Sequence, residues 1–156
     1  MIKINLLTIG TLKEKYLKDA LNEYSKRLSK YASISIYEGK ESKLLNEDYL
    51  STVNEEGEEL LKRIKSDEFV ILLDLHGSEI SSEEFSKKID ILINKGYGKL
   101  CFVIGGTYGV SQKLVERSNF RLCLSKMTFT HQFTRVILLE QIYRAFKIIN
   151  NEPYHH

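Results

Sequence analysis

The chain has 156 residues, 42% of them hydrophobic, and a formal net charge of +2, which fits one globular domain over residues 1–156. Its two cysteines, Cys101 and Cys123, lie in apolar runs, which favours buried thiols in a reducing compartment and leaves a disulfide between them open. The N-terminus is too polar for a signal peptide and no run is long enough to cross a membrane, so we expect a cytoplasmic protein.

Strand and helix patterns alternate in the first half of the chain. Residues 2–9, IKINLLTI, are β-branched and apolar, which predicts a buried strand of the parallel type. Over residues 12–31 apolar and aromatic side chains recur at i, i+4, which predicts a helix. Residues 33–38, SISIYE, alternate and predict a second strand. We expect residues 39–54 to be irregular and mobile, and residues 55–66 to form the next helix.

The second half of the chain continues the same alternation. Its pattern predicts strands at residues 69–77, 100–104 and 120–125, and helices at residues 81–93, 111–118 and 131–150. Ser81 or Ser82 is placed to cap the helix that begins there, because glutamates occupy its first turn. This order of elements favours a three-layer α/β sandwich around a mostly parallel sheet.

The last predicted helix is apolar on more than one face. A single sheet covers only one face of a helix, so we expect this helix to be shared between the subunits of a symmetric dimer. Coverage of the whole helix by its own chain is the alternative.

Three predicted strands end in loops of ligand-binding character: LLDLHG, VIGGTYG and LSKMTFT. In open α/β sheets ligands lie beyond the carboxyl ends of the strands, so we expect the three loops to meet at one crevice. Glycines at positions 105, 106 and 109 allow either a tight turn or a close approach of the backbone to a ligand.

Several familiar chemistries are disfavoured by missing motifs. The first strand is not followed by G-x-G-x-x-G, and the chain contains no P-loop, no H-E-x-x-H and no G-x-S-x-G. The histidines and cysteines lack zinc-ligand spacing, so we expect no metal site. Asp74 and Glu140 stay open as an acid–base pair, although Asp74 can cap a strand end and Glu140 can pair with Arg144 one helical turn later.

Motifs along the whole chain resemble a known family. In order they are GTLKEKYLKDALNEYSKRL, LLDLHG, FVIGGTYG, LSKMTFTHQFTR, LEQIYRAFKI and PYHH. Together they resemble the bacterial large-subunit rRNA pseudouridine N3-methyltransferases, a single-domain branch of the SPOUT superfamily. The resemblance implies a deep C-terminal trefoil knot, a fold feature that is rare among proteins, and a homodimer.

The same resemblance implies S-adenosyl-L-methionine as cofactor and a pseudouridine of the assembled ribosome as substrate, at position 1915 of 23S rRNA in helix 69. By match to the family motifs, the cofactor contacts fall at Leu73, Gly105, Leu124, Ser125, Lys126, Met127, Thr128 and Phe129. Methyl transfer from a sulfonium needs alignment more than it needs a metal, so this assignment is chemically consistent with the missing metal motifs.

Other residues are candidates for catalysis and RNA binding. N3 of pseudouridine must lose a proton, and His131 and His155 both titrate in a useful range, so the choice between them stays open. Arg135 and Arg144 are candidates for phosphate contacts, and Arg135 is also a candidate catalytic residue. Tyr154 can stack on a flipped base that the tail histidine orients. The alternative for this tail is simple fraying.

The chain departs from the family pattern at two positions. Thr130 stands where the family has a proline, so a capping hydroxyl replaces the backbone angle that proline fixes at a helix start. His156 stands where the family tail has a basic residue. Residues 95–147 hold nine basic and two acidic residues, yet the total charge is low, which favours an assembled ribosome over naked RNA as partner. A SPOUT enzyme acting on tRNA and a non-catalytic ribosome-binding module are the alternatives.

Overall fold

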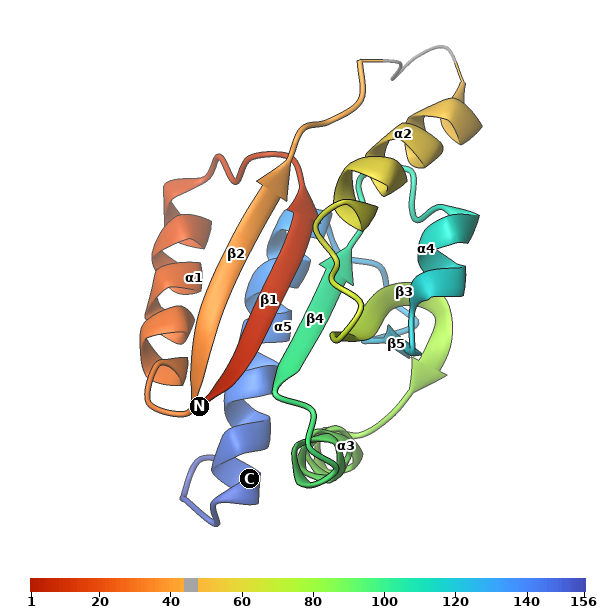
Figure 1. Ribbon diagram of the computed structural model, residues 1–156. Helices are drawn as coiled ribbons and strands as arrows, with labels where there is room; N and C mark the ends of the chain where they lie inside the picture. Colours follow the sequence, from red (N-terminus) through yellow and green to blue (C-terminus); the bar gives the residue numbers. More distant parts are fainter. Residues whose placement is uncertain (44–47) are drawn as a thin grey trace.

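The computed structural model describes residues 1–43 and 48–156, and within these residues five strands alternate with five helices (Figure 1). The strands are β1 (Ile2–Ile9), β2 (Ala32–Gly39), β3 (Phe69–Glu79), β4 (Lys99–Ile104) and β5 (Phe120–Cys123). The helices are α1 (Lys15–Leu28), α2 (Tyr49–Leu61), α3 (Ser82–Asn94), α4 (Gln112–Arg117) and α5 (His131–Ile149).

The five strands form one sheet in the order β2-β1-β4-β3-β5, and every pairing between them is parallel. The prediction of an α/β fold is confirmed, and among the described strands the sheet is wholly parallel where the sequence predicted a mostly parallel one. Because parallel strands run in one direction, their carboxyl ends share one edge of the sheet.

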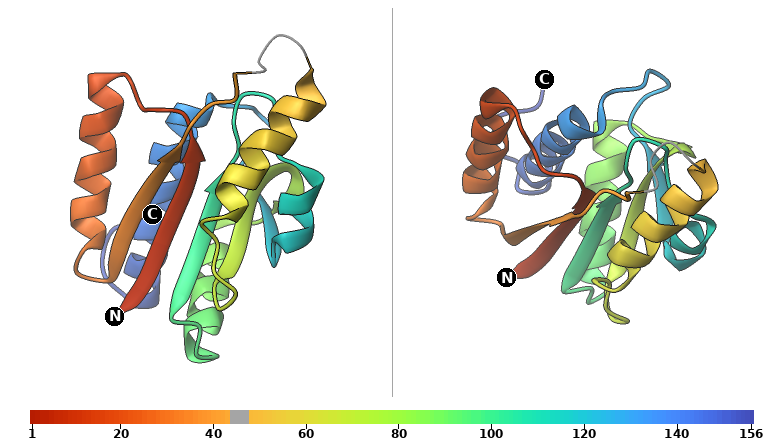
Figure 2. Two further views of the ribbon diagram at one scale, coloured as in Figure 1. Left: turned by 45° about the horizontal axis from the view of Figure 1, so that its top comes forward. Right: turned by 90° about the horizontal axis from the view of Figure 1, so that it is seen from above.

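Helices cover both faces of the sheet (Figures 1 and 2). The side chains of β1 alternate between the two faces, as the period of a strand requires. Ile4 and Leu6 belong to the core formed with α1, α3 and α5, whereas Leu7 and Ile9 belong to the core formed with α2 and α4. The described residues therefore form three layers, with a larger core on the side of α5.

Helix α2 differs from the predicted helix at both ends. It begins at Tyr49 because Asp48 caps it, accepting a hydrogen bond from the Leu50 backbone N–H at 3.0 Å. It ends at Leu61, where i→i+3 hydrogen bonds tighten the chain into a turn. The prediction of an irregular segment over residues 39–54 was therefore wrong for its last six residues, and residues 44–47 of that segment lie outside the described residues.

Gly57 lets α2 pack closely on the start of α4. A Cβ built on Gly57 would lie 2.3 Å from Ser111 Oγ and 2.8 Å from Ser111 Cβ. Ser111 is fixed as the N-cap of α4, since its Oγ accepts from the Leu114 N–H at 3.2 Å. The close approach of Ser111 therefore leaves no room for a side chain at position 57.

We expect Gly57→Ala to lower the free energy of unfolding in a denaturant titration by about 1–2 kcal/mol. Helix propensity alone predicts the opposite, a gain of about 1 kcal/mol. A loss of stability would therefore show that the close contact with Ser111 outweighs helix propensity. Gly98→Ala is the control, because among the described residues no atom lies within 4 Å of its added Cβ. Equal stability of the two variants would contradict this packing.

Helix α5 lies between α1 and α3 on one face of the sheet (Figure 2). Its buried residues are Arg135, Leu138, Leu139, Ile142, Tyr143, Ala145 and Phe146. Val136 and Ile149 are partly buried against the core, whereas Ile137 and Ile148 are partly buried outside it and Phe133 is 46% exposed. The chain itself therefore buries one side of this helix and leaves apolar side chains partly exposed on the other.

Both cysteines are free and buried, as predicted. Burial raises the pKa of the Cys101 thiol to about 12, so this group stays protonated and unreactive at neutral pH.

Candidate active site

The middle of β3 lies beside the carboxyl ends of β4 and β5. Leu73 of β3 is in register with Ile104 of β4, the residue before Gly105. On its other side Leu73 is in register with Leu122 of β5, two residues before Leu124. The sheet therefore brings Leu73, Gly105 and Leu124 close together, but β3 continues past Leu73 to Glu79, so LLDLHG lies within this strand and is not a loop at its end as the sequence predicted. That the three motifs meet at one crevice stays a prediction.

The glycine loop, residues 105–110, is a tight turn. The Gly109 N–H donates to the Gly106 carbonyl at 3.2 Å, and Gly109 has φ +101°. A Cβ built on Gly105 would lie 2.5 Å from the Gly109 carbonyl oxygen and 2.8 Å from Val110 Cγ1. The sequence left two roles open for these glycines, a tight turn and a close approach of the backbone to a ligand. The structure shows the tight turn.

The polar loop, residues 124–130, joins β5 to α5. The Met127 N–H donates to Ser125 Oγ at 3.0 Å, and the Cys123 thiol donates to the Ser125 carbonyl at 3.1 Å. Leu124 and Ser125 are half-buried, whereas the side chains of residues 126–129 are exposed. The loop is therefore exposed over residues 126–129.

Thr130 ends the polar loop and caps α5. Its Oγ1 accepts from the Phe133 N–H at 3.2 Å, and the Thr134 hydroxyl donates to its carbonyl at 2.9 Å. The predicted capping hydroxyl in place of a proline is confirmed.

A cavity of about 200 Å³ lies between the polar loop, the start of α3 and α5. Its lining consists of Ile80, Ser81, Ser82, Phe85, Leu122, Cys123, Leu124, Phe129, Ile137 and Gln141. The lining combines apolar walls with hydroxyl and amide groups, as small-molecule sites do, although the volume suits only part of a nucleoside. Leu124 and Phe129 of the predicted cofactor residues line it, and Leu73 and Gly105 do not.

A second hollow of about 280 Å³ is larger and more open, and its lining includes His76, Ser118 and Arg121. None of the predicted site residues lines it. We place the candidate site at the smaller cavity, because that cavity joins the end of β5 to the polar loop.

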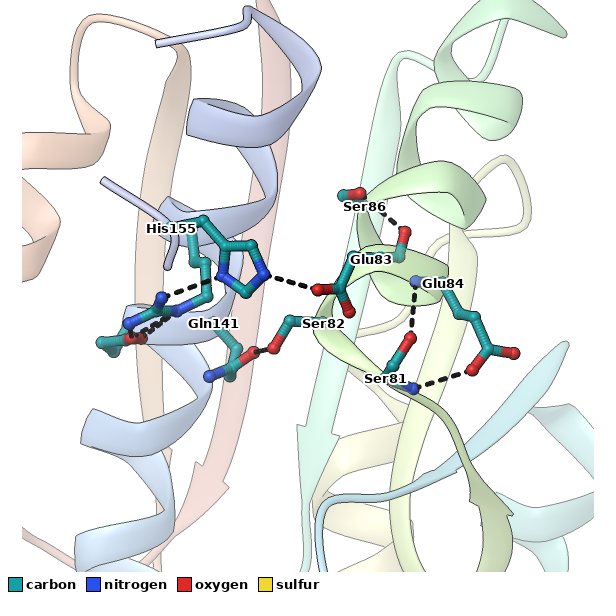
Figure 3. Close-up of polar contacts among 9 residues, drawn as sticks. Ser81, Ser82, Glu83, Glu84, Ser86, Gln141 and His155 are labelled. Atoms are coloured by element: carbon teal, nitrogen blue, oxygen red, sulfur yellow. Dashed lines mark hydrogen bonds and ion pairs between the residues drawn. The ribbon is translucent and has the colours of Figure 1, made fainter. Parts of the chain in front are cut away.

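The start of α3 forms one wall of the site (Figure 3). Ser81 and Glu84 form a capping box, in which the Glu84 N–H donates to Ser81 Oγ at 3.1 Å and Glu84 Oε1 accepts from the Ser81 N–H at 3.1 Å. Ser82 donates its hydroxyl hydrogen to Gln141 Oε1 of α5 at 2.7 Å. Two helices are thereby joined at the rim of the cavity.

The chain end folds back onto the same wall (Figure 3). His155 Nε2 lies 2.6 Å from Glu83 Oε1, and its Nδ1 lies 3.0 Å from Arg144 Nη1. A carboxylate only accepts and a guanidinium only donates, so Nε2 carries the hydrogen and Nδ1 accepts. The hydrogen bond from His155 holds the pKa of Glu83 below its usual value.

Further contacts order the tail, so it does not fray in the structure. The Tyr154 ring meets Tyr143 edge-on at 4.9 Å, and the Arg144 guanidinium lies 4.8 Å from the centre of the Tyr154 ring. Burial raises the pKa of Tyr154 to about 12. Tyr31 donates its hydroxyl hydrogen to Glu152 at 2.7 Å and anchors the tail to the turn between α1 and β2.

The two candidates for an acid–base pair have structural partners. Glu140 pairs with Arg144 at 2.6 Å, which confirms the helical ion pair. Asp74 accepts from the His76 N–H at 3.0 Å and pairs with Arg121 at 3.2 Å, so it holds the bend of β3.

Arg135 is fully buried, where the sequence suggested a phosphate contact or a catalytic role. Its guanidinium donates to Glu38 at 2.7 Å and to the carbonyls of Ile9 and Gly10 at 2.9 Å each. In this conformation it joins α5 to the ends of β1 and β2 and is out of reach of RNA. Because this buried cation is held by three acceptors, its role is structural.

His131 is half-buried at the first residue of α5, and its Nε2 has no hydrogen-bond partner among the described residues. Burial, and then the charge of Arg135, lower the pKa of His131, so the imidazole is neutral at pH 7. Thirteen residues of α5 separate His131 from Arg144, the partner of His155, which is about 20 Å along the helix. One chain therefore does not bring the two histidines together.

Sequence reasoning missed Ser82, Glu83 and Gln141 as residues of this wall. The only signal was the cap-forming serine pair, which marks a helix start and says nothing of its partners.

The fold and the cavity define an open α/β protein whose candidate ligand site lies beyond the carboxyl ends of its parallel strands. No group of histidine, cysteine, aspartate or glutamate side chains among the described residues is arranged to hold a metal ion. Within the same residues, no helix combines the length and the apolar character needed to span a bilayer.

Comparison with known proteins gives the family. Residues 2–155 match the family described as "Predicted SPOUT methyltransferase". The ribosomal RNA large subunit methyltransferase H of Clostridium botulinum (strain Alaska E43 / Type E3) is 51% identical over 158 residues, and that of Clostridium tetani (strain Massachusetts / E88) is 50% identical; the matches cover 99% of each chain. The chain belongs to the SPOUT methyltransferase family.

A solved structure agrees with the fold. The probable methylase family protein from Haemophilus influenzae Rd KW20 superposes with a TM-score of 0.52 at 13% identity, covering 98% of this chain and 70% of that one. The resemblance that the sequence motifs indicated is thus confirmed, and the chain is a methyltransferase that requires a methyl donor and an acceptor.

Proposed function

We propose that the protein transfers a methyl group from S-adenosyl-L-methionine to N3 of a pseudouridine in large-subunit rRNA, the one at position 1915 in helix 69. One observation carries the proposal: relatives about half identical over 99% of both chains are named ribosomal RNA large subunit methyltransferase H. The register that places Leu73 beside the ends of β4 and β5, and the cavity next to the polar loop, support it.

We assign the methyl donor to the region where β3 passes the ends of β4 and β5. The residues present fit part of such a group, because the cavity offers apolar walls at Leu122 and Phe129 and polar groups at its rim, while Leu73 and Gly105 lie outside its lining. Proposed contacts come from Leu73, Gly105, Leu124, Ser125, Lys126, Met127, Thr128 and Phe129. A sulfonium nucleoside supplies an activated methyl group when bound, so the task left to the chain is to align it and exclude water.

His131 is the proposed proton acceptor, of the two histidines that the sequence left open. Its pKa is lowered and its Nε2, a buried atom, has no hydrogen-bond partner among the described residues, so the imidazole is neutral and this nitrogen is not engaged by them. Both nitrogens of His155 are already engaged by Glu83 and Arg144, which suits a residue that orients the tail.

We expect His131→Ala to lower the rate of methyl transfer by about 100-fold while leaving the affinity for S-adenosylmethionine within about twofold of the wild type. His76→Ala is the control, because His76 lies outside the site. Single-turnover assays measure the rate, and titration calorimetry measures the affinity. A rate equal to that of the wild type would remove His131 from the mechanism.

RNA binding is assigned to the tail and its neighbours. Tyr154 offers a ring for a flipped base, and Arg144 and His155 lie beside it. The low net charge of +2 favours the assembled ribosome as the partner, since naked RNA requires a more basic surface.

We further propose one domain over residues 1–156, a C-terminal trefoil knot as family membership implies, a homodimer, and a cytoplasmic site of action. The exposed side chains of Met127, Phe129 and Phe133, 76%, 42% and 46% exposed, support a dimer at this end of α5. In a dimer the tail of one subunit can serve the site of the other, which the separation of His131 and His155 within one chain favours.

Mass spectrometry of 23S rRNA from a strain that lacks the gene tests the substrate. The proposal predicts that the N3 methyl group disappears from the pseudouridine and returns with a plasmid copy. Retention of the methyl group, with loss of one from a tRNA, would favour a tRNA enzyme instead. No change in any RNA, together with no binding of S-adenosylmethionine, would favour a ribosome-binding module.

A further inference from the structure

Glu56, in the middle of α2, is a buried carboxylate that lies against the glycine loop. The residue is 4% exposed, and its Oε2 accepts from the Ser42 N–H at 3.0 Å. Its Oε1 is buried and has no hydrogen-bond partner among the described residues. A buried acceptor without a partner destabilises a fold, so its presence calls for a functional reason.

The free oxygen of Glu56 occupies the space that a side chain at Gly106 would need. A Cβ built on Gly106 would lie 2.5 Å from Oε1 and 3.2 Å from Cδ of Glu56. Only the backbone of the glycine loop therefore separates this carboxylate from Gly105, which the proposed function places at the methyl donor.

No cation among the described residues forms an ion pair with Glu56. Burial raises the pKa of Glu56, the Ser42 N–H opposes that shift, and the carboxylates of Glu41 and Glu55 add to it. Thr52, one turn earlier on the same face of α2, is also fully buried with an Oγ1 that has no partner among the described residues.

We propose that Glu56 recognises the positive charge of the methyl donor, with its free oxygen acting on a cationic nucleoside bound at the glycine loop. The inference rests on the proposed function, because S-adenosylmethionine carries a permanent charge on sulfur and a second one on its amino group. During transfer the sulfur–methyl bond breaks and its electron pair stays on sulfur, while the methyl carbon bonds to N3, whose proton passes to His131. The product is a neutral thioether, so a carboxylate here favours the donor over the spent cofactor.

Three ligands with two, one and no positive charges test this inference by titration calorimetry: S-adenosylmethionine, S-adenosylhomocysteine and 5′-methylthioadenosine. We expect Glu56→Gln to lower the affinity for S-adenosylmethionine by about tenfold or more and to leave the affinity for methylthioadenosine within about twofold of the wild type. Glu55→Gln is the matched control, since it removes the same charge from an exposed position one residue away. It should change none of the three affinities beyond about twofold.

The pattern of losses separates the outcomes. A loss of affinity for S-adenosylmethionine alone places the recognised charge at sulfur. A loss of affinity for both S-adenosylmethionine and S-adenosylhomocysteine places it at the amino group. Either result supports the inference. An equal loss for all three ligands, or no loss, would overturn it and leave the proposed function standing. Failure of the folded wild type to bind any of the three would overturn the proposed function instead.

Folding of the variant is checked by its melting temperature and by its binding of methylthioadenosine. If Glu56→Gln does not fold, Glu56→Asp replaces it, because aspartate keeps the charge but draws it back from Gly106. The expected loss is again confined to the charged ligands, and a loss that includes methylthioadenosine would overturn the inference.

Discussion

Replacing Gly105 with valine is expected to weaken the binding of S-adenosylmethionine by about 100-fold or more, with little change in the overall fold. The added Cβ would lie 2.5 Å from the Gly109 carbonyl oxygen and 2.8 Å from Val110 Cγ1, so the glycine loop must open. Opening this loop moves the backbone at the end of β4, where the donor is proposed to bind. Titration calorimetry measures the affinity, and circular dichroism reports the fold.

Gly98→Val is the matched control for this prediction. Gly98 precedes the same strand, and among the described residues no atom lies within 4 Å of a Cβ built there. The control should bind S-adenosylmethionine as the wild type does. Unchanged affinity in Gly105→Val would show that the glycine loop takes no part in the site.

Replacing Arg135 with alanine is expected to lower the free energy of unfolding by about 3–5 kcal/mol. The substitution removes three hydrogen bonds and leaves the carbonyls of Ile9 and Gly10 without their buried donor. Burial lowers the pKa of the Arg135 guanidinium, but its contact with Glu38 opposes that shift, and the group stays charged. Denaturant titration measures the change.

Arg144→Ala is the control for Arg135→Ala, because Arg144 also lies on α5 and pairs with a carboxylate but is partly exposed. Its loss should lower the free energy of unfolding by only about 1 kcal/mol. Arg135→Lys should fall between the two, since lysine keeps the charge but not the fork of donors. Equal effects of the two alanine substitutions would show that Arg135 is not the tie that its contacts indicate.

The sheet and its helices were predictable because their signals are local. Apolar strands and i, i+4 stripes identify each element, and the common direction of parallel strands then places Leu73, Gly105 and Leu124 close together. The start of α2 was not predictable in the same way, since Asp48 caps it within a polar segment of weak periodicity.

Much of the site depends on contacts between distant residues, which local patterns do not encode. Burial of Arg135 requires acceptors on β1 and β2, and the position of His155 requires Glu83, 72 residues away. Glu56 resembles the exposed glutamates beside it in sequence, and only the packing of α2 on the glycine loop distinguishes it.

A crystal structure of the protein with S-adenosylmethionine bound is the most direct test of the central claim. The account predicts that adenine and ribose contact the backbone of Leu73, Gly105 and residues 124–129, where β3 passes the ends of β4 and β5. Density for the cofactor in the hollow beside His76 and Arg121, or away from these residues altogether, would contradict it.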